Sequence, residues 1–506
     1  MHRRRSKPLI WILALIFVLT CLLLQSIRLR GDGLSYYAYD RSLLFDHDLD
    51  FANEFQAYNP AHDATPDLTR RTDTGLVSNP YTVGPALLWS PFILVVHMVY
   101  RATRLGVDLC AAPAATGYEF PYVAAITLGT NFYALLGLLA LCSVSAHYFG
   151  SRPAFMAVLG IWFGTSYLHY LYFEPAYAHV LGASLVALFI WSYNLYHAHR
   201  HWSLLLRTGV IAGLMILTRW QNAVFLIIPV VDAVMSLMKI SSRSRKQITC
   251  AVIQSWIFIS IVVLLFMPQA LVWKQLYGRW LTVPMGTTSM RWFAPALLEV
   301  LFSARNGLFA WTPLVAISVV GLAFLYRQDQ PLAIALLIAL LAQWWVNASV
   351  ADWWGGSAFG GRRFIDSSVI FVVGLAGVLH QMAQWRGGRT IGLLALSLTI
   401  AWNVALWTQY AVGTPPVQSM HDLGQIYWGQ FTDGFPQVYR LLGRSTWLDL
   451  AVRSGILQQQ WTNVRTALVW MVALTVMVYL VVRGASIVGI SNTAALGTPN
   501  VGRRHP

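Results

Sequence analysis

The sequence predicts an all-α integral membrane protein, a polytopic transmembrane bundle of about 11–13 helices. Three observations predict this class. The chain has 506 residues, of which 57% are hydrophobic and only 11% are charged, whereas soluble proteins usually carry about 25% charged residues. The apolar residues come in runs of about 18 or more, long enough to cross roughly 30 Å of hydrocarbon as a helix. Runs of that length exclude a β-barrel, whose strands alternate over about ten residues.

The apolar runs predict the spans and the loops between them. A single transmembrane domain is expected over residues 1–491, followed by a disordered tail at 492–506. External loops are expected at about 28–84, 274–308, 350–366 and 411–465, the first carrying short amphipathic helices. The topology between 101 and 175 stays open, with one span there partial or re-entrant. The spans are expected at roughly 8–27, 85–103, 122–147, 153–172, 175–197, 205–222, 223–239, 248–273, 309–326, 331–349, 367–385, 389–410 and 466–483.

The charge pattern suggests an orientation. The net charge of +15 fits cytoplasmic loops that collect Lys and Arg better than it fits nucleic-acid binding, and an anionic lipid substrate is a further interpretation. Arg3-Arg4-Arg5 precedes the first apolar run, and no small-x-small cleavage site follows it. We therefore expect a retained first helix with a cytoplasmic N-terminus, in a bacterial inner membrane. The four scattered cysteines form neither a disulfide framework nor a metal-binding pattern.

The first loop begins with a carboxylate at the membrane surface. Asp32 stands between Gly31 and Gly33, about one turn beyond the first apolar run, where it would lie near a lipid head group. The glycines allow backbone or substrate to approach closely. A helix-cap or turn role is the alternative, because Gly-Asp-Gly is common in loops. Tyr36 and Tyr37 follow and are candidates for substrate binding.

Alternating carboxylates follow in the same loop. Asp48, Asp50 and Glu54 are candidates for substrate or divalent-cation binding, with a solvated acidic loop as the alternative. The calcium-loop pattern fails, because Phe51 and Ala57 occupy the positions that need Gly and Glu. No cofactor is required by the sequence, and a divalent cation stays possible.

Several charged groups lie at or near membrane depth. Glu174 precedes the helix-breaking Pro175, with His179 shortly after it, and Arg219 lies at an apolar stretch. A charge at the bilayer centre costs about 3 kcal/mol on insertion scales, so such residues usually face a cavity or a partner. Arg219 is therefore expected either in a buried ion pair or at a helix end, or as a ligand of phosphate, which guanidinium groups bind at two points.

A Gly- and Trp-rich segment contains the densest group of candidate residues. Trp353 and Trp354 are followed by four glycines and then by Arg362 and Arg363, and Arg305 stands in a similar aromatic setting. An interfacial aromatic belt explains many of the 22 tryptophans, but not this interleaving. Aromatic faces beside cationic groups are what a sugar or a phosphosugar needs.

In their order along the chain, these motifs resemble the membrane glycosyltransferases of the GT-C fold, such as the protein O-mannosyltransferases and the lipid A aminoarabinose transferases. Asp32 matches the family's acidic residue after the first helix, although Gly33 stands where a second acid often follows. Glu174 is similar to a carboxylate of the next external loop. The segment from Asn79 to Trp89 resembles the polar, proline-containing start of the second helix, and Gly360 to Phe364 resembles a late Gly-x-Arg-aromatic element.

The resemblance implies transfer of a sugar from a polyprenyl-phosphate donor to a lipid, glycan or protein acceptor on the external, periplasmic face. Asp32 would be the general base of an inverting displacement, and Glu174 would assist it or orient the acceptor. The leaving phosphate needs cationic stabilisation. The expected ligands of this phosphate are four arginines, namely Arg219, Arg305, Arg362 and Arg363.

Two alternatives come from the same observations. A multi-pass transporter or flippase of lipid-linked sugars would also have many helices and buried charges, but it favours inverted repeats, which the sequence does not show. A polysaccharide polymerase or ligase would place its main catalytic loop late, in residues 411–465. The sequence does not name the sugar, the acceptor, a metal requirement or the oligomeric state.

Overall fold

The computed structural model describes residues 6–58, 68, 70–104, 115–238, 245–412, 424, 428 and 461–488. Within these residues every regular element is a helix, and the two β-bridges are isolated. The fourth expected loop, at 411–465, lies almost entirely outside the described residues, as does the tail at 492–506.

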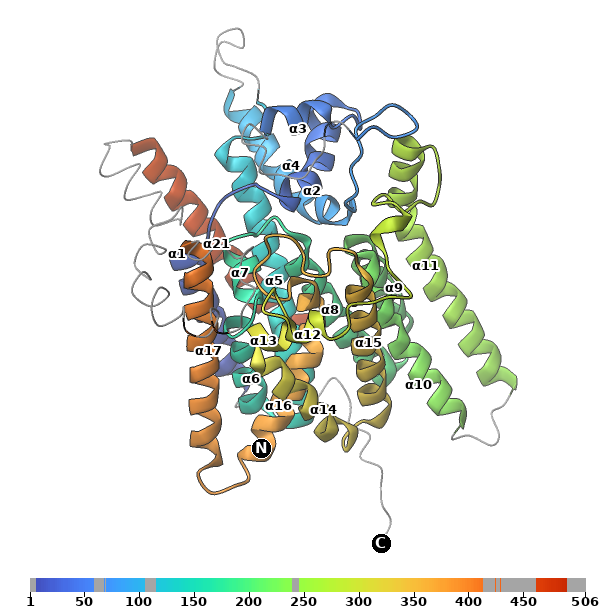
Figure 1. Cartoon of the computed structure of the whole chain (residues 1–506), viewed down its shortest axis with the longest axis vertical. Coiled ribbons are helices and arrows are strands. Elements are labelled where there is room, and N and C mark those ends of the chain that lie inside the picture. Colours follow the sequence, from blue (N-terminus) through green and yellow to red (C-terminus); the bar gives the residue numbers. More distant parts are fainter. Residues whose placement is uncertain are drawn as a thin grey trace.

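The long helices form a bundle (Figure 1). Within the described residues, seven helical segments are long and apolar enough to cross a membrane. They lie in α4 (Gly84–Arg104), α5 (Phe120–Phe149), α8 (Ala178–His199), α11 (Arg245–Tyr277), α15 (Gln330–Ser349), η5 with α16 (Arg362–Ser367 and Ser368–Met382) and α17 (Gly388–Val412).

Shorter apolar helices complete the bundle. They are α1 (Ser6–Leu24), α9 (Trp202–Thr218), η3 with α10 (Trp220–Leu226 and Ile227–Met238), α14 (Pro313–Tyr326) and α21 (Trp461–Val488). Each predicted span thus coincides with a helix or a pair of helices. The span expected at 153–172 is divided into α6 (Ser151–Phe163) and α7 (Tyr167–Tyr172), because α6 ends at Gly164. This break falls in the part of the chain where the sequence left the topology open.

Burial separates central from peripheral helices. Nearly all of α8 is buried, whereas none of the apolar window of α11 is, so α8 lies at the centre and α11 at the edge (Figure 1). Small residues allow the central helices to pack closely. A Cβ atom added to Gly374 of α16 would overlap the Ser318 carbonyl oxygen of α14, and one added to Gly137 of α5 would lie 2.7 Å from the Ser184 backbone of α8.

The first loop forms a helical cap on one end of the bundle, at the top of Figure 1. It contains α2 (Asp32–Arg41), the π-helical turn η2 (Ser42–Asp46) and α3 (Ala52–Tyr58). Residues 33–39 of α2 are all buried, and Ser90 of α4 donates a hydrogen bond of 2.6 Å to Asp40. The cap is therefore packed onto the bundle, and the N-terminus of α2 is held at its edge.

Two late segments of the chain lie below the cap in Figure 1. The short helices α12 (Glu299–Phe302) and α13 (Leu308–Trp311) precede α14, and the loop 350–361 connects α15 to η5. Backbone hydrogen bonds join the segment before α12 to the end of α15 and the start of this loop, from the Arg291 amide to the Ser349 carbonyl (2.6 Å) and from the Ala351 amide to the Ser289 carbonyl (2.8 Å). This packing positions the arginines that follow.

Candidate active site

Asp32 is the first residue of α2 and is held by two side chains from distant parts of the chain. Its Oδ2 atom lies 3.1 Å from Nη1 of Arg362, and the Tyr81 hydroxyl donates a hydrogen bond of 2.7 Å to Oδ1. The preceding Gly31 has a φ of +55°, and an added Cβ would overlap the Tyr177 hydroxyl, so glycine is required there. The Asp32 side chain is 15% exposed, so the protein does not enclose it completely.

Arg362 reaches Asp32 from η5, the turn that opens α16. Gly360, with a φ of +60°, redirects the chain just before it. The Arg362 guanidinium also lies over the Tyr177 ring, 5.6 Å from its centroid. Its Nε atom is buried and has no hydrogen-bond partner among the described residues. The guanidinium is therefore only partly used by the protein.

A second ion pair lies deeper. Arg219, the residue that ends α9, has its Nε atom 2.9 Å from Oδ2 of Asp366, and both side chains are buried. Arg219 also donates from Nη1 to Nδ1 of His179, near the start of α8. Because Arg has only donors, the His179 ring accepts at Nδ1 and is neutral. The pair fits closely, since a Cβ added to Gly182 would overlap Oδ1 of Asp366.

Asp366 is a residue that the sequence analysis missed. It lies on the same short turn as Arg362, so η5 supplies a cation to one ion pair and an anion to the other. One signal was available: a buried Arg219 needs a carboxylate partner, and Asp366 immediately precedes the span expected at 367–385. Tyr81 and Tyr177 were also not singled out as site residues.

Glu174 lies in the turn between α7 and α8 and is almost fully buried. Arg30 donates to it from two nitrogens, Nε at 2.7 Å and Nη2. Burial raises the pKa of Glu174, against the opposing effect of Arg30 and with a smaller contribution from Asp32. The structure thus brings Glu174 near Asp32 and gives it a charged partner of its own.

The two adjacent tyrosines of α2 differ in their surroundings. The Tyr36 ring meets the Tyr81 ring edge to face, with 4.9 Å between centroids, so Tyr36 lies beside the Asp32 group. Burial raises the pKa of Tyr36, which keeps its hydroxyl protonated. Tyr37 instead donates a hydrogen bond of 2.6 Å to the Gly117 carbonyl and so supports the cap.

The acidic residues farther along the first loop make local contacts. Asp48 accepts hydrogen bonds from the Ser42 hydroxyl (2.8 Å) and from the Asp50 backbone amide (3.1 Å). Asp50 accepts a hydrogen bond from the backbone amide of Ala52, the first residue of α3. Glu54 is buried and pairs with Arg41 at 2.9 Å. Across the described part of the chain, no three His, Cys, Asp or Glu side chains gather to hold a metal ion.

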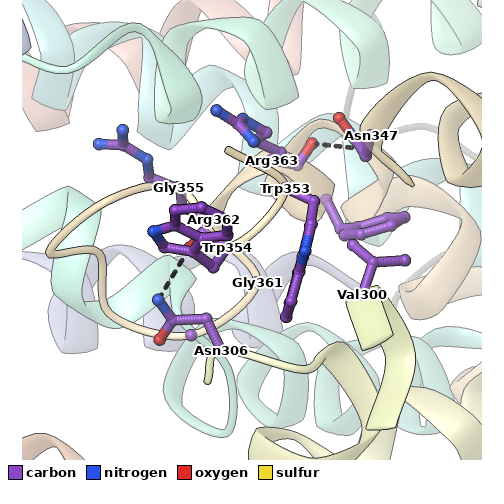
Figure 2. Close-up of a pocket in the computed structure, with 11 residues that line it drawn as sticks. Val300, Asn306, Asn347, Trp353, Trp354, Gly355, Gly361, Arg362 and Arg363 are labelled. Atoms are coloured by element: carbon purple, nitrogen blue, oxygen red, sulfur yellow. Dashed lines mark hydrogen bonds between the residues drawn. The ribbon is translucent and has the colours of Figure 1, made fainter. Parts of the chain in front are cut away.

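The Gly- and Trp-rich loop forms a small pocket next to Arg362 (Figure 2). Trp353, Trp354 and Arg363 line it. Arg363 pairs with Asp352 at 2.8 Å. The Arg305 guanidinium stacks on Trp354, 4.1 Å from the ring centroid. The late arginines and tryptophans are thus gathered at one place, although each arginine has a different environment.

Comparison with known proteins identifies the fold. No family model and no curated protein matches the chain. Among solved structures, the chain is similar to ArnT from Cupriavidus metallidurans bound to undecaprenyl phosphate. The TM-score is 0.50 and the sequence identity 12%, over 95% of this chain and 78% of ArnT. It is also matched to the apo oligosaccharyltransferase of Archaeoglobus fulgidus, with a TM-score of 0.48 and 14% identity, over 86% of this chain and 60% of that one.

The likeness to ArnT, an aminoarabinose transferase, confirms the GT-C fold expected from the motifs. Together with the seven apolar helical segments it makes this chain a multi-pass integral membrane protein. At 12% identity the likeness shows the fold alone.

Proposed function

We propose that this protein is a membrane glycosyltransferase that moves a sugar from a polyprenyl-phosphate donor to an acceptor hydroxyl. The observation that carries the proposal is the partly open carboxylate of Asp32, held by Tyr81 and Arg362 at one end of a bundle with the GT-C fold. A carboxylate fixed beside a cation is what this reaction needs: a base for the acceptor and a counter-charge for the leaving phosphate.

The transfer is a direct displacement. The acceptor oxygen attacks the anomeric carbon while its proton passes to Asp32. The new carbon–oxygen bond forms as the bond from the anomeric carbon to the phosphate oxygen breaks, and polyprenyl phosphate leaves with the electron pair. Attack from the face opposite the leaving group inverts the anomeric centre. Phosphate is a weak base, so its departure needs positive charge rather than a strong acid.

Arg362 would couple donor binding to the base. In the free protein its guanidinium pairs with Asp32 at 3.1 Å and keeps an unused Nε donor. A donor phosphate beside Arg362 would also pair with the guanidinium, and this would weaken the ion pair between Arg362 and the Asp32 carboxylate. The Asp32 carboxylate would then be released from Arg362 and could contact the acceptor hydroxyl only when the donor is in place.

The buried ion pair of Arg219 and Asp366 would position η5, and with it Arg362, against Asp32. The donor-phosphate role predicted for Arg219 stays a prediction, and its pairing with the buried Asp366 favours a positioning role. Breaking such a pair leaves an unpaired buried charge, so the pair holds η5 firmly. Arg305 has no acidic partner among the described ion pairs and is better suited to meet the donor phosphate.

The location of the reaction follows from the expected topology. With the N-terminus in the cytoplasm, the α2–α3 cap and Asp32 would face the periplasm of a bacterial inner membrane. The donor would arrive in the outer half of that bilayer, and the acceptor would be a lipid, a glycan or a protein. A divalent cation is not required by this mechanism.

A reconstituted assay tests the proposal. Purified protein in liposomes is supplied with polyprenyl-phosphate hexose carrying a radiolabelled sugar, together with extracted envelope lipids and glycans. The expected result is label in an acceptor fraction and release of free polyprenyl phosphate in equal amount. Movement of intact lipid-linked sugar between leaflets, with the glycosyl phosphate bond unbroken, would instead identify a transporter.

A further inference from the structure

The chain between α11 and α13 exposes many of its large apolar side chains. We call residues 280–302 of this connection the apolar segment. The Phe293 side chain is completely exposed. Exposed apolar patches on a protein surface commonly mark contacts with another protein or with a membrane. The exposed large apolar residues of the segment are Trp280, Leu281, Val283, Met285, Trp292, Phe293, Leu298 and Phe302.

Hydrogen bonds place the second half of the apolar segment beside the end of α15 that is nearer the cap. The Arg291 amide donates to the Ser349 carbonyl at 2.6 Å, and Ser349 is the last residue of α15. The Trp344 indole, more than one turn inside α15, donates to the Leu297 carbonyl at 3.0 Å. Because α15 is long and apolar enough to cross a membrane, its last turns mark the membrane border. The segment therefore lies at that border.

The apolar segment connects two helices that face lipid. It directly follows α11, none of whose apolar window is buried. On α15, Leu337, Leu341 and Trp345 are exposed at intervals of one helical turn, and this stripe ends one turn before Ser349. On membrane-spanning helices such exposed apolar faces contact acyl chains. The segment thus continues the lipid-facing surface of the bundle.

The composition of this region is that of a membrane interface. Trp280 and Trp292 are exposed, and Trp is enriched where head groups meet acyl chains. Basic side chains near such a boundary are attracted to lipid phosphates. Between positions 274 and 302 the exposed charged residues are one acid, Glu299, and three bases, Lys274, Arg279 and Arg291.

We infer that the apolar segment inserts into the membrane leaflet on the side of the α2–α3 cap. Its partner is the lipid surface itself. Phe293 and Leu298 lie about 5–10 Å below the head groups, at the boundary with the acyl chains, and Arg279 and Arg291 lie at the level of the phosphates. This interaction surface is independent of the proposed function, because it requires no sugar transfer.

The inserted segment holds the loop that leads to Arg362. Met290 forms an antiparallel bridge with Val350, and the Ala351 amide donates to the Ser289 carbonyl at 2.8 Å. The loop 350–361 runs from this bridge to Arg362, the first residue of η5. Membrane contact at the apolar segment therefore fixes where this loop begins, relative to the lipid head groups.

Fluorescence quenching in lipid nanodiscs tests the insertion. The polarity-sensitive fluorophore NBD is attached in turn at Phe293→Cys, at Leu264→Cys on the exposed face of α11, and at Gln56→Cys, an exposed position of α3 in the cap. Cys110→Ser and Cys250→Ser remove competing thiols, while Cys21 and Cys142 are buried and stay.

The three labels should differ in what quenches them. At position 293 we expect blue-shifted emission and the strongest quenching by lipids with a nitroxide near the head group. At position 264 a nitroxide deep in the acyl chain should quench best, and at position 56 only iodide in the water should quench. Iodide quenching at 293 equal to that at 56 overturns the inference. Protection of position 293 from both lipid nitroxides and iodide also overturns it, because protein rather than lipid would then cover the segment.

Hydrogen–deuterium exchange in the same nanodiscs tests the link to the loop. Phe293→Asp puts a charge at the acyl boundary, and since the side chain is completely exposed, internal packing is preserved. We expect amides of residues 350–361 to lose protection, because local opening speeds exchange. Trp385→Asp is the matched control, at an exposed turn between α16 and α17 at the opposite end of the bundle (Figure 1), and should leave these amides unchanged. Equal exchange at 350–361 in both variants contradicts the link.

Discussion

The Asp32 carboxylate and the Arg362 guanidinium lie 3.1 Å apart, although they come from the first loop and from the last third of the chain. The pair joins α2 to η5 at the edge of the helical cap. In the proposed function, Asp32 is the base and Arg362 is a ligand of the donor phosphate.

Asp32→Asn should abolish sugar transfer while leaving the fold intact. The amide keeps the size of the side chain and its contact with Tyr81, but it cannot take a proton. We expect kcat to fall by at least about 10²-fold, the lower end of the contribution of general acid–base catalysis, with little change in Tm. The control is Asp73→Asn, since the Asp73 side chain is 81% exposed. Normal turnover by Asp32→Asn would rule out the base assignment.

Arg362→Lys should be impaired and Arg362→Gln more so. Lys retains a charge but lacks the planar group that contacts carboxylate and phosphate at two points. Loss of one such stabilising group typically costs about 10²–10³ in kcat, and we expect the Gln variant to reach that range. Arg279→Gln serves as control, because Arg279 forms a surface pair with Asp73. Equal activity of the Lys variant and the unmodified protein would contradict two-point binding.

Gly182→Ala should destabilise the protein through its deep ion pair. The added methyl group would overlap Oδ1 of Asp366 and approach Cδ of Arg219 to 3.0 Å. Separating a buried pair costs about 3–5 kcal/mol, so thermal unfolding in detergent should show a clear drop in Tm and loss of transfer. Gly484→Ala in α21 is the matched helical control, since its Cβ would meet nothing within 4 Å. A Tm equal to that control would show that the site can relax.

The cap should be less stable at alkaline pH because of Glu54. Burial raises the pKa of Glu54 from 4.5 to about 7. The folded state therefore favours the protonated acid, and its contribution is fully present below pH 4.5 and is lost as the pH rises through 7. Between pH 5 and pH 8 we expect Tm to fall more steeply for the unmodified protein than for Glu54→Gln. Parallel Tm curves would show that Glu54 does not titrate in this range.

The long spans were predictable because bilayer thickness imposes a simple length rule on apolar runs. The break at Gly164 was not, because α6 and α7 together read as one apolar run and only tertiary packing divides them. The order of Asp32, Glu174 and the late arginines along the chain predicted the GT-C fold. The likeness to ArnT confirms that fold.

The pairing within the site was not predictable from the sequence. Asp366 was overlooked because nothing local marks it; its importance comes from Arg219, which belongs to a different helix. Asp48 and Asp50, in contrast, were predicted as ligand-binding residues, but the structure shows them in local contacts. A carboxylate that binds backbone amides at a turn and one that binds a ligand have the same sequence pattern, and only their contacts distinguish them.

The position of η5 in the chain has a consequence for biosynthesis. Asp32 and Arg219 both leave the ribosome well before Arg362 and Asp366 are made. During insertion into the membrane, the early helices therefore carry an uncompensated buried charge until the last third of the polypeptide is translated. A nascent chain stalled before residue 362 should be a substrate for membrane quality-control proteases, and the site would mature only at the end of synthesis.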